Sequence, residues 1–115
     1  MVKKIVYWKG LRAIIGLIFQ LPDRNTIYIL DLGEDRVADV HTFFCLKDLD
    51  IVLISGNLDI VGRYLGVKPF RIIFPKRKFR FIVEGLNLSE KDMERAISFI
   101  KENVYAKSFT TFRIY

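Results

Sequence analysis

The residues best suited to chemistry lie between Ile60 and Val83, a stretch that contains seven basic residues and no acid. Lys and Arg side chains neutralise phosphates and release counterions, which gives salt-dependent binding to nucleic acid. The same charges could instead form a solvated hairpin tip that protects an edge strand from aggregation. On the first interpretation, six side chains contact DNA or RNA, namely Lys68, Arg71, Lys76, Arg77, Lys78 and Arg80.

Acidic residues suggest a second chemistry. Asp31 is expected at the carboxyl end of one strand and Asp59 just beyond the end of another, which Asp50 begins. Ligands gather at the carboxyl ends of strands in open α/β sheets, and carboxylate oxygens suit Mg²⁺ or Mn²⁺. These three residues define the alternative hypothesis, a metal-dependent nuclease, whereas the binding hypothesis needs no cofactor. In a competing interpretation, Ser55, Asn57 and Asp59 cap a following helix.

The residues from Asp50 to Asp59 read Asp-Ile-Val-Leu-Ile-Ser-Gly-Asn-Leu-Asp. This segment resembles the strand-then-Ser-Gly-Asp-x-Asp segment of PIN/NYN-type ribonucleases. Asn57 stands where that family's pattern has an acid, and the N-terminal meander predicted below does not belong to that fold. The resemblance implies the same nuclease activity, and it covers only these residues.

A third possible chemistry is nucleophilic catalysis by Cys45 with His41, which would share a face if they lie on a helix. A working dyad also needs an orienting group and an oxyanion site, and the sequence identifies neither. We therefore interpret Cys45 as a core residue and His41 as a structural one. The single cysteine also excludes an internal disulfide and a Cys-rich zinc site. Because no catalytic motif is specific enough to name an activity, we lean towards a protein without enzymatic activity.

The charges divide unevenly along the chain. Residues 31–59 carry seven acids and two bases, whereas the remainder carries six acids and seventeen bases. Such a division could favour a third function, a protein-interaction or assembly subunit that forms a homo-oligomer in which the acidic segment of one subunit meets the basic hairpin of another. It could equally be neutralised within one chain, and the sequence leaves both possibilities open.

The composition indicates one globular domain that spans residues 1–115. The hydrophobic fraction of 51% provides a core, and the net charge is +6. The apolar run at residues 13–19 is too short to span a membrane, so we expect a cytoplasmic protein. One Gln, four Asn and nineteen Lys plus Arg favour a thermophilic source.

The elements that position these residues begin with strands at residues 3–8, 11–20 and 26–31, joined as a meander with a turn at 22–25. A helix is expected at 36–46. A buried strand at 50–55, a helix at 58–65 that ends at Gly66, and a strand at 70–74 then suggest a parallel crossover unit.

A hairpin of residues 70–74 and 79–83 is expected to carry the basic stretch. In this register Phe74 faces Phe79, Ile72 faces Phe81 and Phe70 faces Val83, which places all six on the core side. Arg71 and Arg80 would share the other face.

The C-terminal part predicts a helix at 90–105 with Ser89 as its N-cap and Asp92 completing a capping box. Leu88 and Met93 fit a hydrophobic staple, and residues 108–115 predict a final strand. Together the elements predict an α/β or α+β domain with a mixed sheet and two or three helices. The leading functional hypothesis is a small basic nucleic-acid-binding protein, without a choice between DNA and RNA.

Overall fold

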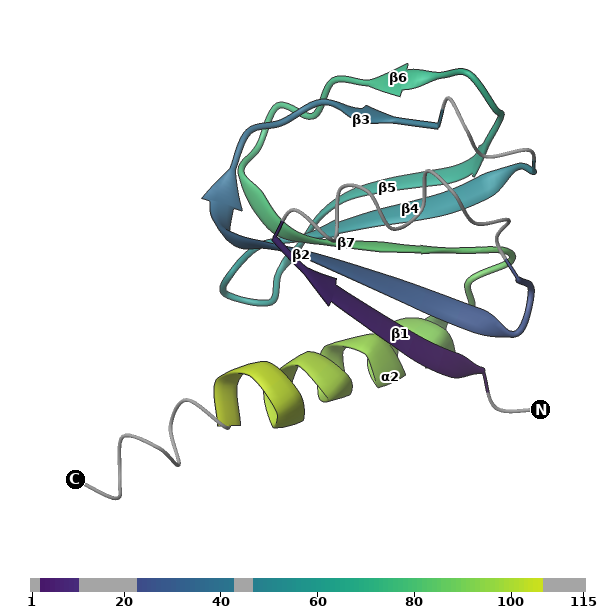
Figure 1. Ribbon diagram of the computed structural model, residues 1–115. Coiled ribbons are helices and arrows are strands. Elements are labelled where there is room, and N and C mark those ends of the chain that lie inside the picture. The colour runs from purple at the N-terminus through teal and green to yellow at the C-terminus, as the bar shows by residue number, and fades with distance from the viewer. Residues whose placement is uncertain (1–2, 11–22, 43–46, 107–115) are drawn as a thin grey trace.

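The computed structural model describes residues 3–10, 23–42 and 47–106, and five strands of this part form one mixed sheet (Figure 1). β1 and β2 run parallel, and every other neighbouring pair is antiparallel. The predicted mixed sheet is therefore confirmed. The order across the sheet is β1 (Lys4–Lys9), β2 (Thr26–Arg36), β7 (Phe79–Gly85), β4 (Leu49–Ile54) and β5 (Ile60–Val67).

The predicted N-terminal meander is wrong, because β1 and β2 are parallel neighbours. A parallel pair needs a crossover connection of about a dozen residues or more, and residues 10–25 supply it. The expected turn is present from Asp23, whose Oδ1 accepts the N–H of Asn25 at 2.9 Å. The strand expected at 11–20 lies outside the described residues.

The helix predicted at 58–65 is wrong, because this stretch is strand β5 and pairs antiparallel with β4. Gly66 is not a helix C-cap. It has a φ of +64° in an irregular part of the β4–β5 pairing, where its N–H donates to Asp50 Oδ1 at 2.8 Å. A glycine in this left-handed conformation is typical of a β-bulge as well as of a helix end. The predicted parallel crossover unit is therefore an antiparallel hairpin.

The predicted hairpin of residues 70–74 and 79–83 is also wrong. β7 is buried on both faces and pairs with β2 and β4, so both of its edges are occupied. The short strand β6 (Ile72–Ile73) instead pairs with β3 (Val40–His41) in a two-stranded ribbon above the sheet (Figure 1). Since β3 is extended, the helix expected at 36–46 is absent wherever that segment is described.

The C-terminal helix confirms its prediction. α2 (Glu90–Ile100) begins at Ser89, whose Oγ accepts the N–H of Asp92 at 3.1 Å, and the Asp92 carboxylate accepts the N–H of Ser89 at 2.9 Å. The helix continues as the π-helical turn η1 (Lys101–Tyr105). Among the described residues this is the one helix, where two or three were predicted, and the fold is α+β-like. The final strand expected at 108–115 lies outside the described residues.

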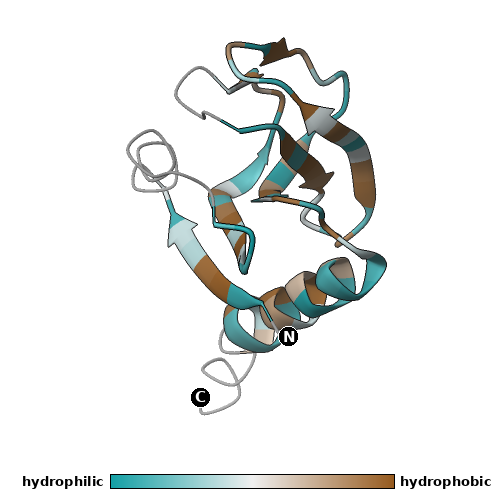
Figure 2. Ribbon diagram, turned by 90° about the vertical axis from the view of Figure 1, so that its right-hand side faces the viewer, coloured by the Kyte–Doolittle hydropathy of each residue, from teal (hydrophilic) through white to brown (hydrophobic). Residues whose placement is uncertain are grey.

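The sheet separates two apolar clusters. On the face toward the β3–β6 ribbon, the cluster includes Tyr28, Ile51 and Phe79, and on the opposite face Phe81 and its neighbours pack against α2. Figure 2 shows hydrophobic residues concentrated along the strands and on part of the helix. Burying each large apolar side chain contributes roughly 1.5–3 kcal/mol, so the two clusters hold ribbon, sheet and helix together.

Candidate functional site

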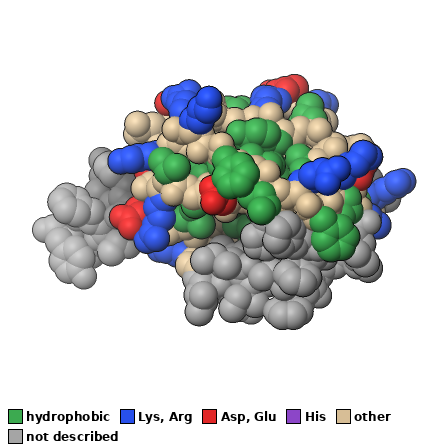
Figure 3. All heavy atoms as spheres, turned by 90° about the horizontal axis from the view of Figure 1, so that it is seen from above, with side chains coloured by type: hydrophobic (Ala, Val, Ile, Leu, Met, Phe, Trp, Pro, Cys, Tyr) green, Lys and Arg blue, Asp and Glu red, His purple; other side chains and the backbone are tan. Residues whose placement is uncertain are grey.

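The basic side chains predicted to contact nucleic acid lie mainly on the outer surface of the ribbon and the loop that follows it. Lys68 and Arg71 flank the start of this segment, and the 76–78 loop precedes β7, all with exposed side chains. Viewed from the ribbon side, Lys and Arg side chains border a patch of hydrophobic ones (Figure 3). We call five residues the basic surface, namely Lys68, Arg71, Lys76, Arg77 and Lys78.

The apolar side chains beside the basic surface face solvent, and this corrects the predicted core register. Phe70 is 65% exposed, Ile72 46% and Phe74 67%. Only Ile73 of this strand packs against the cluster on the ribbon face of the sheet. Phe79, Phe81 and Val83 are buried as predicted, although Phe79 packs on the opposite face of the sheet from the other two. In the 70–74 segment the predicted alternation fails, because Arg71 is exposed together with Phe70 and Ile72. Two aromatic rings consequently stand among the basic side chains.

Thr42, which is 1% exposed, fixes the backbone that carries Phe70. Its Oγ1 donates to the carbonyl of Lys68 at 2.8 Å and accepts the N–H of Arg71 at 3.0 Å. Its backbone N–H donates to the carbonyl of Arg71 at 2.9 Å, and its carbonyl accepts the N–H of Phe70 at 3.1 Å. The turn at residues 68–71 is thus held from beneath by one buried threonine.

Arg80 does not belong to the basic surface, which corrects the sixth predicted contact. Its Nε donates to Asp31 Oδ1 at 2.8 Å and its Nη2 to Asp31 Oδ2 at 3.1 Å. Asp31 is fully buried, and it also accepts hydrogen bonds from the Tyr7 hydroxyl and the Gly33 N–H. Burial alone raises the pKa of Asp31, but the hydrogen bonds from Arg80, Tyr7 and Gly33 hold it below its ordinary value.

Tyr105, at the end of η1, lies beside this ion pair. The Arg80 guanidinium carbon lies 5.4 Å from the centre of the Tyr105 ring and 4.9 Å from that of Phe81. The Tyr105 hydroxyl donates to the carbonyl of Gly56 at 2.8 Å. Arg80 therefore joins β2, β7 and η1 in the interior of the fold.

The three predicted metal ligands are not brought together. Asp50, at the start of β4, accepts the N–H groups of Gly66 and Leu88 at 2.8 and 2.9 Å. Asp59 is exposed in the turn beyond the other end of that strand, and Asp31 is engaged by Arg80. Within residues 3–10, 23–42 and 47–106, no three His, Cys, Asp or Glu side chains gather in a way that could hold a metal ion.

Ser55, Asn57 and Asp59 do not cap a helix, because β5 follows them. Ser55 Oγ accepts the N–H of Asp59 at 3.2 Å and so closes the turn between β4 and β5. The segment that resembles a ribonuclease motif is thus a strand and the turn of a hairpin. The third candidate cannot be placed, since Cys45 and the side chain of His41 lie outside the described residues.

Glu84, which the sequence did not single out, is a second buried acid. It lies on β7 opposite Tyr28 and Ile51 and is 5% exposed, and its side chain makes no hydrogen bond or ion pair within the described part of the chain. Burial raises its pKa to about 8. The sequence signal was an acid that directly follows the apolar run of β7, where a solvated strand end was the simpler interpretation.

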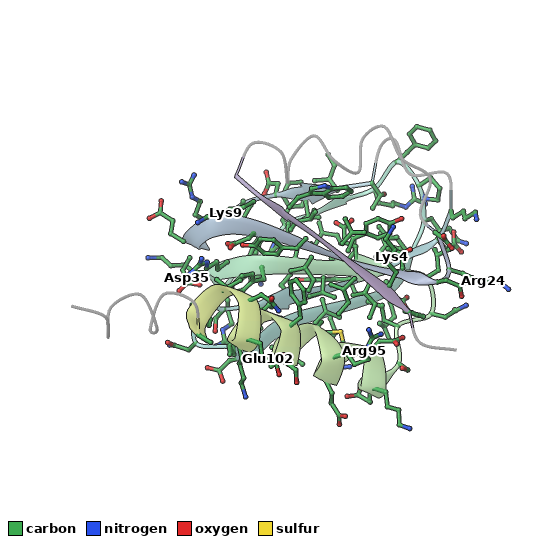
Figure 4. The ribbon with its side chains drawn as sticks, turned by 60° about the horizontal axis from the view of Figure 1, so that its bottom comes forward. Lys4, Lys9, Arg24, Asp35, Arg95 and Glu102 are labelled. Carbon is green, nitrogen blue, oxygen red and sulfur yellow. The ribbon has the colours of Figure 1, made fainter. Side chains whose placement is uncertain are left out.

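An open depression of about 390 Å³ lies beneath β1, on the helix face of the sheet. Figure 4 shows Arg95 and Glu102, two of its lining residues, along the helical segment. One guanidinium nitrogen of Arg95, Nη1, is buried without a hydrogen-bond partner among the described residues. The depression is separated from the basic surface by the sheet, and its lining mixes charges, with Ile5, Glu94, Arg95, Ser98, Phe99 and Glu102.

No helix in the described ranges combines the length and apolar character needed to cross a bilayer. No family model matches the chain. A UPF0127 protein of Pyrococcus horikoshii is 33% identical over 90 residues, which cover 71% of this chain and 77% of that protein. A UPF0127 protein of Pyrococcus furiosus is 32% identical over 75 residues, 65% of this chain and 64% of that protein. These thermophilic relatives support the thermophilic character expected from composition.

Two solved structures share the fold. A protein from Sinorhizobium meliloti described as a putative transcription regulator has a TM-score of 0.63 at 17% identity, covering 80% of this chain and 72% of its own. A protein from Novosphingobium aromaticivorans has a TM-score of 0.65 at 12% identity, covering 77% and 67%. At these identities the likeness shows the fold alone.

Proposed function

We propose that this chain, which belongs to the UPF0127 family, is a nucleic-acid-binding protein that contacts phosphates through its basic surface. The observation that carries the proposal is the 76–78 loop, where Lys76, Arg77 and Lys78 are all exposed. Within the described residues none of the three has an ion-pair partner. Consecutive unpaired cations are free to exchange their counterions for the phosphates of a nucleic acid.

The remaining members of the basic surface extend this charge along the ribbon. Arg71 is exposed directly before β6. Lys68 is exposed as well, although its Nζ lies 3.3 Å from Asp48 Oδ2. Exposed ion pairs are worth only about 0–1 kcal/mol, so a phosphate can replace Asp48 at small cost. Five exposed cations therefore lie between the end of β5 and the start of β7.

A metal-dependent nuclease has less support than a binding protein. Asp31 uses both of its oxygens as acceptors for Arg80, and Asp50 uses both of its own for backbone N–H groups. A cation at either carboxylate would have to compete with these hydrogen bonds for the oxygens. The proposal therefore concerns binding and names no reaction.

The test is a fluorescence-anisotropy titration of labelled DNA and RNA with the wild type and a variant in which Lys76, Arg77 and Lys78 are changed to Glu. The matched control changes Arg24, Lys91 and Lys101 to Glu, three exposed cations outside the basic surface, so both variants lose the same charge. We expect binding to be lost in the loop variant and largely kept in the control. Equal losses in both variants would reduce the effect to net charge and overturn the proposal.

A further inference from the structure

We infer that the basic surface takes single-stranded nucleic acid, with Phe70 and Phe74 as platforms on which unpaired bases stack. This inference rests on the proposed function and gives its substrate class. Its basis is the juxtaposition of two exposed aromatic rings with the five cations of the basic surface. Base–aromatic stacking combined with a positively charged track is the general way in which proteins hold single strands.

Phe70 is held in a conformation that its own side chain does not favour. Its φ of +61° lies in the left-handed region, which is rare for a bulky residue. Such a conformation persists only where the surroundings enforce it, and it is concentrated at functional sites. The packing of its ring does not enforce it, because the ring is 65% exposed. The hydrogen bonds between Thr42 and the backbone of residues 68–71 enforce it instead, because they fix the residues before and after Phe70.

The backbone of Phe74 is restrained by the proline that follows it. Pro75, which follows it, is buried, and a residue before proline is restricted to extended conformations. The ring is 67% exposed and stands directly before the 76–78 loop. Both phenylalanines are therefore fixed by their backbones with their rings in solvent. A backbone that is already restrained loses less conformational entropy when a base stacks on its side chain, which strengthens binding.

Cationic and aromatic side chains alternate along this segment, which suits the phosphates and the bases of a nucleic-acid strand. Lys68 and Arg71 flank Phe70, and Phe74 precedes Lys76, so each ring has a cation within a few residues. A single strand offers exposed base faces for the rings and phosphates for the cations. A duplex offers the phosphates, but its base faces are stacked against one another. The outward rings thus favour a single strand over a duplex.

The test measures the anisotropy of a labelled single-stranded oligonucleotide and of a hairpin duplex of the same length at constant salt. The variants are Phe70→Ala, Phe74→Ala and the corresponding Leu variants, which keep apolar bulk without a flat ring. Leu65→Ala is the matched control, because Leu65 is also 65% exposed but lies on β5. Thermal unfolding of each variant by circular dichroism shows whether the fold is retained.

We expect the wild type to prefer the single strand. Each Ala variant should weaken single-strand binding by roughly 5- to 150-fold, each Leu variant should lose most of the same factor, and Leu65→Ala should bind as wild type. Equal affinity for the duplex together with wild-type binding by the Phe variants would overturn the inference and leave the proposed function standing. No binding of any oligonucleotide at low salt would overturn both.

The same preparation should be mixed with vesicles of phosphatidylcholine and phosphatidylserine, because anionic lipid surfaces also attract cations and aromatic rings. We expect no vesicle binding that depends on Phe70 and Phe74. Vesicle binding lost in both Ala variants, in the absence of oligonucleotide binding, would replace the nucleic acid with a membrane surface.

Discussion

Asp31 and Arg80 lie 49 residues apart in the sequence and form a two-point ion pair, with Nε–Oδ1 and Nη2–Oδ2 distances of 2.8 and 3.1 Å. The sequence suggested one as a metal ligand and the other as a phosphate contact. In the structure the two residues instead bind each other inside the fold, beside Tyr7 and Tyr105. This pairing removes one residue from each candidate site and neutralises part of the acidic segment within the chain.

Arg80→Ala should therefore act on stability. It leaves the buried Asp31 carboxylate without its cation, a change that typically lowers the free energy of unfolding by about 3–5 kcal/mol. Urea denaturation at pH 7 measures this, and Arg77→Ala is the control, because Arg77 is exposed. An Arg80→Ala variant as stable as the control would contradict the structural role of the pair.

The same pair predicts loss of stability in acid. The pKa of Asp31 is lower in the folded chain than its ordinary value. Its contribution is thus present above the unfolded pKa of about 4 and is lost as the pH falls through the lower, folded one. Denaturation between pH 5 and 2 should show this decline in the wild type. In Asp31→Asn the decline should be shallower, and an unchanged slope would contradict the assignment.

Glu84 predicts the opposite dependence near neutral pH. Its pKa is raised from 4.5 to about 8 by burial, so the folded chain binds a proton that the unfolded chain releases. Stability from this group is complete below pH 4.5 and falls as the pH rises through 8, by about 5 kcal/mol in total. Glu84→Gln should abolish the dependence and be more stable at pH 8.

The control for Glu84 is Glu94→Gln, on the exposed side of α2. It should keep the wild-type decline in urea stability between pH 5 and 9. If Glu84→Gln also keeps that decline, another group is responsible for it.

Thr42→Val should release the turn that presents Phe70. It removes the hydroxyl that bonds Lys68 and Arg71 and leaves partly buried backbone groups without that partner, at a cost of about 1 kcal/mol. We expect weaker single-strand binding with duplex affinity unchanged, although Thr42 is 1% exposed. Thr42→Ser keeps the hydroxyl and should restore both stability and binding. Failure of serine to restore either would argue against the hydrogen bonds as the cause.

Elements whose own residues contain a strong local signal were predicted correctly from the sequence. Ser89 and Asp92 marked the start of α2, and runs of β-forming residues marked β1, β4 and β7. The apolar spacing of β5 fitted a helix equally well, and Gly66 is used at helix ends and at bulges alike. Only the pairing with β4 decides between the two, and pairing is a long-range property that local spacing does not contain.

Some features of the candidate site could also be predicted from the sequence, and others could not. The exposed cations of the basic surface were predicted from charge alone, since Lys and Arg are seldom buried without partners. The outward direction of Phe70 and Phe74 was not, because alternation defines two faces of a strand without saying which is covered. Thr42 gave no signal, because its partners lie 26 and 29 residues away.

The measurement closest to the central claim is the salt dependence of single-strand affinity for the wild type, the 76–78 loop variant and the charge-matched control. Five phosphate contacts predict a slope of log K against log salt of roughly −3.5, and loss of three contacts should reduce its magnitude by about 2. The control should keep the wild-type slope. A wild-type slope near zero, or the same slope for all three proteins, would contradict phosphate binding by the basic surface.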